Sequence, residues 1–201
     1  MKVGRLATQL QYSIITLLLI NVFPLPALAQ DDHSHTLTPL SNELTAEQKS
    51  KASALLKIVR QSTERFHNVA VAEAEGYALQ FGCVSGENAG AMGLHYVNGP
   101  LVNGGVVDAT RPQILLYEAT SNGRLRLTGA DYLVVADQWN AKHSSPPELM
   151  GQLFHLFDAP NRFRLPAFYT LHVWAWKDNP NGAFVNWHPS VSCDSFTEHN
   201  H

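Results

Sequence analysis

The spacing of apolar residues along this 201-residue chain predicts helices first and strands afterwards. Between residues 45 and 66, apolar side chains recur every three or four positions, which is the spacing of an amphipathic helix. Thr45 and Gln48 form a capping box at its start. A second helical stretch ends at Gly76, a residue type favoured just past the end of a helix. We therefore expect two helices before residue 77.

From Tyr77 onward, runs rich in branched and aromatic residues alternate with turns rich in glycine, asparagine and proline. Asn122-Gly123 is a hairpin signal and predicts antiparallel pairing of the runs on either side. Ser145-Pro146-Pro147-Glu148 resembles a helix start and predicts a helix to about Phe157. The expected strands are 91–98, 113–119, 123–137 and 168–176. This order predicts an α+β fold: N-terminal helices followed by an antiparallel sheet or half-barrel, with one helix inserted before the last strand.

The first 29 residues have the three parts of a secretory signal peptide: a basic start, an apolar run and a small-residue cleavage site. The apolar run is about half the roughly 20 residues that span a bilayer, which favours a cleaved signal over a permanent anchor. We expect cleavage after Ala29, a flexible lead over residues 30–44, and a single α+β domain over residues 45–201. The mature protein is expected to be secreted or periplasmic.

Charge and hydropathy narrow the range of partners. Removal of residues 1–29 takes away two of the 14 basic residues and none of the 17 acidic ones, so the formal charge changes from −3 to −5. No basic cluster is left, which argues against nucleic acid as a partner. No later run is long and apolar enough to cross a bilayer, so we expect no integral membrane segment after cleavage. The pattern identifies no particular small ligand or protein partner.

The chain has two cysteines, Cys83 and Cys193, and we predict that they form a disulfide because an exported chain enters an oxidising compartment. A thiol nucleophile is the weaker interpretation, because neither cysteine lies in a recognisable motif.

Four polar residues share strand faces with apolar neighbours, because side chains alternate along a strand. Glu118 shares a face with Ile114, and Asp131 shares one with Leu133. His95 and His172 likewise fall on apolar faces. A buried charge is costly unless it is paired or binds a metal, so these four residues need partners.

Convergence of these residues would suit a divalent transition metal such as zinc, iron or manganese. In that hypothesis His95, Glu118 and His172 are the ligands, Asp131 is a candidate base, and His155 is a further candidate ligand. The competing interpretation pairs His95 with an acid and has His172 donate to a backbone carbonyl. A metal-free pair of a histidine and a carboxylate acting in acid–base chemistry is a third alternative.

Four blocks of the sequence resemble an uncharacterised family of exported bacterial proteins. They are "GAMGLHYVNG", "RPQILLYE", "PNRFRLPAFYTLHVWAWKDNPNGAF" and "NWHPSVSC", and the resemblance covers most of residues 70–193. It implies no activity, but it supports His95, Glu118 and His172, which lie in these blocks. The chain differs from the family pattern at His188, where an acid or asparagine context is expected, so the resemblance gives His188 no role.

Three functions follow as hypotheses. The first is a non-enzymatic module that binds a metal ion or small ligand in a pocket containing His172. The second is a metal-dependent enzyme, a hydrolase or an oxygenase, that uses His95, Glu118 and His172. The third is a structural or interaction protein of the cell envelope. We favour the first.

Overall fold

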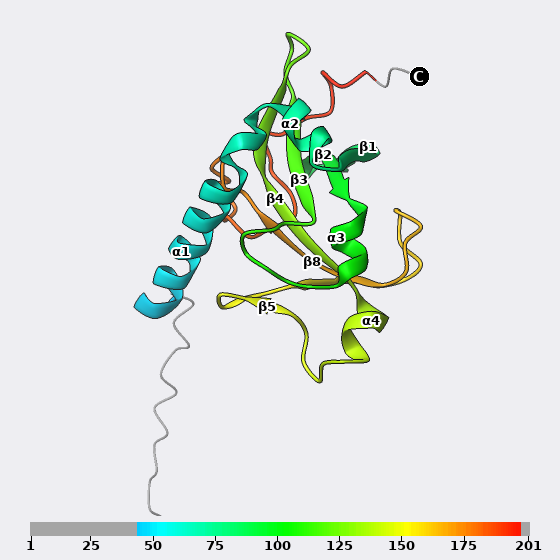
Figure 1. Ribbon diagram of the computed structural model, residues 1–201. Coiled ribbons are helices and arrows are strands. Elements are labelled where there is room, and N and C mark those ends of the chain that lie inside the picture. Colours follow the sequence, from blue (N-terminus) through cyan, green and yellow to red (C-terminus); the bar gives the residue numbers. More distant parts are fainter. Residues whose placement is uncertain (1–43, 198–201) are drawn as a thin grey trace, which may run out of the picture. The chain divides into compact units, whose positions relative to one another are not determined.

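The computed structural model describes residues 44–197 of the chain (Figure 1). The expected signal peptide and nearly all of the expected lead lie outside the described residues, as do the last four residues. Within residues 44–197, no helix is both long enough and apolar enough to cross a membrane.

The described part of the chain begins with helices, as the apolar spacing predicts. They are α1 (Ala46–Thr63), the short 3-10 helix η1 (Glu64–His67) and α2 (Val69–Ala74). The predicted capping box is confirmed: the Gln48 backbone N–H donates to the Thr45 hydroxyl, and the Gln48 side chain accepts from the Thr45 backbone. The first helix therefore begins where its sequence signal lies.

A six-stranded antiparallel sheet follows, in the strand order β1-β2-β3-β4-β8-β7. The predicted hairpin at Asn122-Gly123 is confirmed by the pairing of β3 with β4. The expected fold class, α+β with an antiparallel half-barrel sheet, is confirmed as well. The strands are β1 (Tyr77–Gly86), β2 (Gly90–Asn98), β3 (Ile114–Ala119), β4 (Leu125–Val135), β7 (His155–Phe157) and β8 (Phe168–Val173).

The helix expected between Ser145 and Phe157 is wrong. That segment forms two short paired strands, β5 (Glu148–Leu149) and β6 (Gln152–Leu153), and then β7. Met150 and Gly151 both have positive φ values, 51° and 82°, which make a tight hairpin turn and interrupt any helix. Two short helices lie elsewhere: α3 (Gly99–Gly104), expected as a turn, and α4 (Ala136–Asn140), which follows β4 directly.

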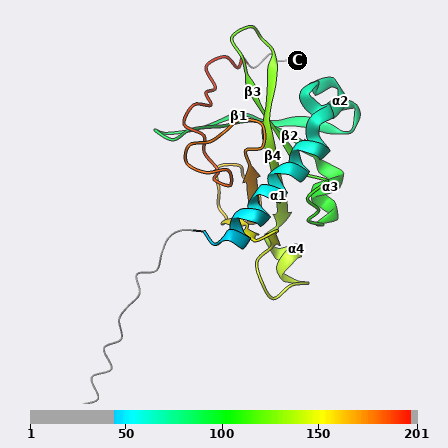
Figure 2. The ribbon, with the colours of Figure 1, turned by 90° about the vertical axis from the view of Figure 1, so that its left-hand side faces the viewer.

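The two faces of the sheet are covered differently. Helix α1 lies across β4 (Figure 2), and its Leu55 and Val59 are fully buried against Tyr132 and Leu171. Phe66 of η1 continues this apolar layer over β2 and β3. The opposite face carries a smaller apolar cluster, packed mainly by aromatic and aliphatic side chains from β7 and the loop that follows it. A loop therefore covers most of this second face, and Val102 of α3 packs at its margin.

The sheet curls strongly between β2 and β8. In a flat sheet, three strand spacings would separate these strands by about 14 Å. Instead, the ring centroids of His95 in β2 and His172 in β8 are 5.7 Å apart. A β-bulge at Thr128 and the following Gly129 lie in β4, between the two strands. A Cβ atom at Gly129 would lie 2.1 Å from the Val173 carbonyl oxygen, so glycine lets the end of β8 approach β4 closely.

The predicted disulfide between Cys83 and Cys193 is present and ties the C-terminal segment to β1. Its two cysteines are 110 residues apart, so it closes the sheet-forming part of the described chain, from β1 onward, into one loop. No described cysteine is free.

Gly129→Ala should lower the free energy of unfolding by about 1–3 kcal/mol, because the added methyl group overlaps the Val173 carbonyl and forces β8 away from β4. Gly104→Ala is the matched control, since a Cβ there meets nothing within 4 Å. The control should be neutral or stabilising by up to about 1 kcal/mol. Urea unfolding followed by circular dichroism measures both, and equal effects would contradict this role of Gly129.

Replacing both Cys83 and Cys193 with serine should lower the free energy of unfolding by about 4–5 kcal/mol, because the bridge restricts a loop of 110 residues in the unfolded chain. The variant and the reduced wild type should then have the same free energy of unfolding in guanidinium. Thiol titration of denatured, unreduced wild type should find no free thiol; finding two would show that the bridge does not form.

Candidate metal centre

Three polar side chains meet on the face of the sheet opposite α1. Asp131 in β4 is the direct cross-strand partner of His172 in β8, so the two side chains project from the same face. His95 in β2 reaches them because the sheet curls. Each of the three residues offers one ligand atom, and these atoms all lie within 4.8 Å of one another. The sequence prediction that polar residues from distant strands converge is correct for these three.

The cluster is shielded from water. His95 is 6% exposed, and Asp131 and His172 are each 2% exposed. A cavity of about 30 Å³ borders all three residues. Its other walls are apolar apart from the Thr170 hydroxyl, and four phenylalanines contribute to them. The three polar side chains thus lie at the inner end of an apolar cavity.

A backbone carbonyl sets the orientation of His95. The Nδ1 atom of His95 lies 3.2 Å from the Gly93 carbonyl oxygen, which can only accept a hydrogen bond, so Nδ1 carries the proton. The lone pair of the neutral ring is then on Nε2. Hydrogen bonds of this kind fix the tautomer of metal-binding histidines.

His172 lacks such partners. Both of its ring nitrogens are buried, and neither has a hydrogen-bond partner within the described residues. Its Nδ1 atom is 3.5 Å from Asp131 Oδ1, which is too long and poorly aligned for a hydrogen bond. The alternative in which His172 donates to a backbone carbonyl is therefore wrong. Two unsatisfied polar atoms in the interior are unusual, and an ordered water or a bound ion would satisfy them.

Asp131 is held by Thr170, whose hydroxyl donates to Asp131 Oδ1. Thr170 lies two residues before His172 in β8 and therefore on the same face. Sequence reasoning did not identify Thr170, although its position relative to His172 is a signal that could have done so. Thr170 leaves acceptor capacity on the carboxylate, since a carboxylate can accept about four hydrogen bonds.

Burial decides the charge of each group. Burial lowers the pKa of His95 to about 4, with the neighbouring His172 adding to the effect. Burial also lowers the pKa of His172 to about 3. It raises the pKa of Asp131 to about 6, although Thr170 opposes the change. At neutral pH the cluster therefore consists of two uncharged imidazoles and one carboxylate, which are the protonation states that bind a metal.

The donor set fits a divalent transition metal. Two imidazoles and one carboxylate are ligands of zinc and of non-haem iron, and Zn–N and Zn–O bonds are about 2.0–2.2 Å long. Ligand atoms around a tetrahedral ion are then about 3.3 Å apart. The candidate ligand atoms lie up to 4.8 Å apart, so a bound ion would draw the three side chains closer together. His172 and Asp131 already face each other across adjacent strands.

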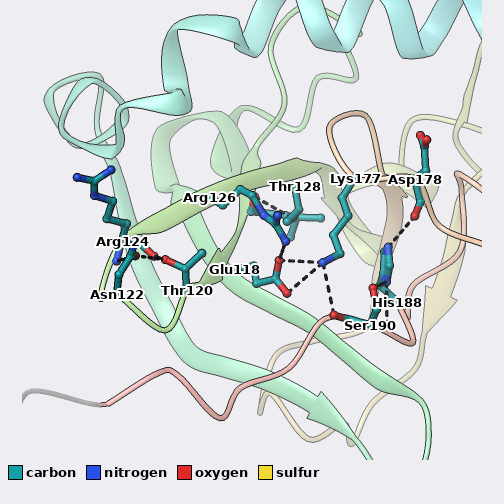
Figure 3. Close-up of polar contacts among 11 residues, drawn as sticks. Glu118, Thr120, Asn122, Arg124, Arg126, Thr128, Lys177, Asp178, His188 and Ser190 are labelled. Carbon is teal, nitrogen blue, oxygen red and sulfur yellow. Dashed lines mark hydrogen bonds and ion pairs between the residues drawn. The ribbon is translucent and has the colours of Figure 1, made fainter.

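Glu118, the carboxylate expected among the ligands, does not belong to the cluster. It lies further along β3 and is held by Lys177 and Arg126 (Figure 3). The Lys177 Nζ atom is 2.9 Å from Glu118 Oε2. Burial raises the pKa of Glu118, but the hydrogen bonds and charges of Arg126 and Lys177 outweigh it, and the net pKa is lowered. Asp131, expected as a base, provides the carboxylate of the cluster instead.

The other histidines among the described residues lie outside the cluster. His155, the further candidate ligand, is exposed, and its Nδ1 atom is 3.2 Å from Asn186 Oδ1. His188 is buried beside Trp174, and it accepts a hydrogen bond from the Ser190 backbone through Nδ1. Its Nε2 atom lies 3.0 Å from the Asp178 carbonyl oxygen. Both ring nitrogens of His188 are thus satisfied, which is the pattern of a structural histidine.

Comparison of the chain with protein-family models, with curated proteins and with solved structures found no match. The resemblance to a family of exported bacterial proteins therefore stays a prediction. The geometry of the cluster is what carries the functional argument.

Asp131→Asn should raise the stability of the metal-free protein at pH 7 to 8, because the buried carboxylate is ionised there without a counter-charge. The pKa of Asp131 is raised from 3.8 to about 6. Its contribution to stability is therefore fully present below pH 3.8 and is lost as the pH rises through 6. Urea unfolding in EDTA measures this effect. At pH 8 the free energy of unfolding of the variant should exceed that of wild type by on the order of 2–3 kcal/mol, and the difference should shrink towards pH 5.

Glu118→Gln is the control of opposite sign. The pKa of Glu118 is lowered, so its ionised form contributes stability that is present at neutral pH. This variant should lose stability at pH 8, as measured by the same urea unfolding. A gain for Glu118→Gln, or a loss for Asp131→Asn, would contradict the assignment of charges.

Proposed function

We propose that this chain binds one divalent transition-metal ion through His95, Asp131 and His172. The single observation that carries the proposal is the convergence of their ligand atoms within 4.8 Å inside a buried apolar face. Isolated buried polar groups are costly, and a metal ion would satisfy all three at once. The unpartnered ring nitrogens of His172 support the same conclusion.

The hydrogen bonds behind the ligands also support metal binding. Gly93 positions His95, and Thr170 positions Asp131. Supporting contacts of this kind orient the ligands of protein metal sites, and the carbonyl behind His95 also increases the basicity of its ring. With one carboxylate and two neutral histidines, a divalent ion would retain a net positive charge, which attracts a water molecule or an anionic donor. Zinc, iron(II) and manganese(II) are the candidate ions.

A second candidate function is that of a metal-dependent enzyme, a hydrolase or an oxygenase. One observation favours it: three protein ligands leave a coordination position open, and a cavity of about 30 Å³ borders the cluster. Structural metal sites are usually closed by four protein ligands, whereas catalytic sites hold three and keep a position for water or substrate. The same open position also serves a module that binds a small ligand.

We also propose that the protein works outside the cytoplasm. The disulfide between Cys83 and Cys193 supports this location, because such bonds persist in oxidising compartments. A metal site assembled from histidines and aspartate, with no cysteine ligand, is compatible with the same surroundings.

The test is metal binding by the purified chain. The protein is stripped with a chelator, exposed in turn to zinc, iron(II) and manganese(II), desalted and assayed for metal by mass spectrometry. We expect about one ion per wild-type chain for at least one metal. His172→Gln and Asp131→Asn should each weaken binding by more than tenfold in calorimetry, because each removes a ligand atom.

Two control variants make the result specific. Glu118→Gln changes a buried acid outside the cluster, and His155→Ala changes an exposed histidine whose Nδ1 atom contacts Asn186 and is not one of the three clustered groups. Both should retain wild-type metal affinity. Trace metal in the wild type after all three exposures would overturn the proposal, as would equal losses in the controls and in the ligand variants.

A further inference from the structure

A second and larger cavity adjoins the cavity at the cluster. The inner cavity, of about 30 Å³, and the outer one, of about 350 Å³, have four lining residues in common: Phe81, Ile114, Leu133 and Leu165. Small-molecule sites in proteins usually enclose about 300–1,000 Å³, so the outer cavity alone is large enough for a small ligand.

The sheet places the outer cavity directly beside the candidate metal ligands. Leu133 lies two residues beyond Asp131 in β4, and Val97 lies two residues beyond His95 in β2. Both are on the same face as the ligands, about 7 Å along the strands. A molecule that fills the outer cavity would therefore extend towards the cluster.

The walls of the outer cavity are apolar. Its lining residues are aliphatic, aromatic or glycine apart from Gln80, and none is charged. An apolar lining with a few polar groups at one end is the usual composition of a site for an uncharged organic ligand. The polar end here is the cluster of His95, Asp131 and His172.

Phe81 is the most unusual residue of this wall. Its φ value is 66°, in the left-handed region that bulky residues rarely adopt, and it lies in an irregularity of β1 between Gln80 and Cys83. Backbone strain of this kind costs about 1–3 kcal/mol and is concentrated at ligand contacts. The side chain is 48% exposed, and its ring lies 5.6 Å from that of Phe163. The strained backbone thus holds an accessible aromatic ring over both cavities.

From these observations we propose that the two cavities form one cleft for a small, uncharged, apolar or aromatic molecule that carries an oxygen donor for the metal. The inference rests on the proposed metal site. The donor group occupies the open coordination position, and the apolar body lies against Phe81, Leu133 and Leu165.

Two hydroxamates test the proposal, because they have the same metal-binding group and differ in their bodies. Acetohydroxamate carries a methyl group and benzohydroxamate a phenyl ring. In calorimetry with the metal-loaded wild type, benzohydroxamate should bind at least about tenfold more tightly, a gain that needs only about 60 Å² of apolar surface removed from water. Phe81→Ala should reduce the ratio to below about threefold and leave the metal content unchanged.

Leu153→Ala is the matched control, since Leu153 is an exposed leucine, 62% accessible, that lines neither cavity. It should retain the wild-type ratio. Equal affinity of the two hydroxamates for metal-loaded wild type would overturn the cleft and leave the metal site standing.

Binding of indole to the protein in EDTA, measured by NMR saturation transfer, tests the cleft without the metal. It therefore separates failure of the cleft from failure of the metal site. Metal-free wild type should bind indole, and Phe81→Ala should bind it at least about threefold more weakly. If the wild type takes up no metal, the proposal of a metal-coordinated ligand fails together with the metal site. Loss of indole binding in that same protein would show that the apolar cleft is wrong in its own right.

Discussion

The curl of the sheet between β2 and β8 is the constraint on which the candidate site depends. His95 and His172 belong to strands separated by two others, yet their ring centroids are 5.7 Å apart. The extra residue Thr128 in β4 bends that strand. Its buried hydroxyl donates a hydrogen bond to the Leu116 carbonyl, so this polar group of the bulge has a partner. Gly129 then lets β8 close in on β4. The bulge and Gly129 in β4 thus contribute to the curl that brings three side chains from three strands together.

The buried cluster of His95, Asp131 and His172 lowers the stability of the fold. An apolar face interrupted by two histidines and an aspartate loses the burial that aliphatic residues would supply, and it adds the cost of removing polar groups from water. The opposite face compensates, because α1 and η1 bury two large apolar clusters there. The disulfide restrains the unfolded chain in addition. Stability and candidate function thus reside on opposite faces of one sheet.

Local signals in the sequence predicted the local structure well. The capping box at Thr45 and the hairpin at Asn122-Gly123 each depend on a few neighbouring residues, and both are confirmed. The segment after Ser145 was misjudged because a turn with two positive φ values, at Met150 and Gly151, leaves little trace in apolar spacing. Predictions that depend on four or five adjacent residues were reliable where no unusual backbone conformation intervened.

The site was predictable only in part, for a different reason. Alternation along a strand tells which face a side chain takes, and it correctly selected His95, His172 and Asp131 as polar residues on apolar faces. Alternation does not give the position of each side chain along its strand relative to the neighbouring strands. For this reason Glu118 was expected among the ligands, although it pairs with Lys177 instead. The bulge at β4 also reverses the alternation before Gly129, so Leu127 packs on the helix-covered face, opposite to Asp131. Strand order, register and curl are properties of the whole sheet.

The size of the inner cavity links the metal site to the cleft. About 30 Å³ holds roughly two water molecules, so a metal ion bound by His95, Asp131 and His172 would complete its coordination with very little solvent. Water confined between an ion and apolar walls has few hydrogen-bond partners, and a ligand donor that displaces it loses little by doing so. The low polarity of the surroundings also strengthens the attraction between the ion and an oxygen donor. If a metal binds there as proposed, the phenylalanine walls would favour exchange of its water for an organic ligand, which would give a chemical reason for a metal at the end of an apolar cleft.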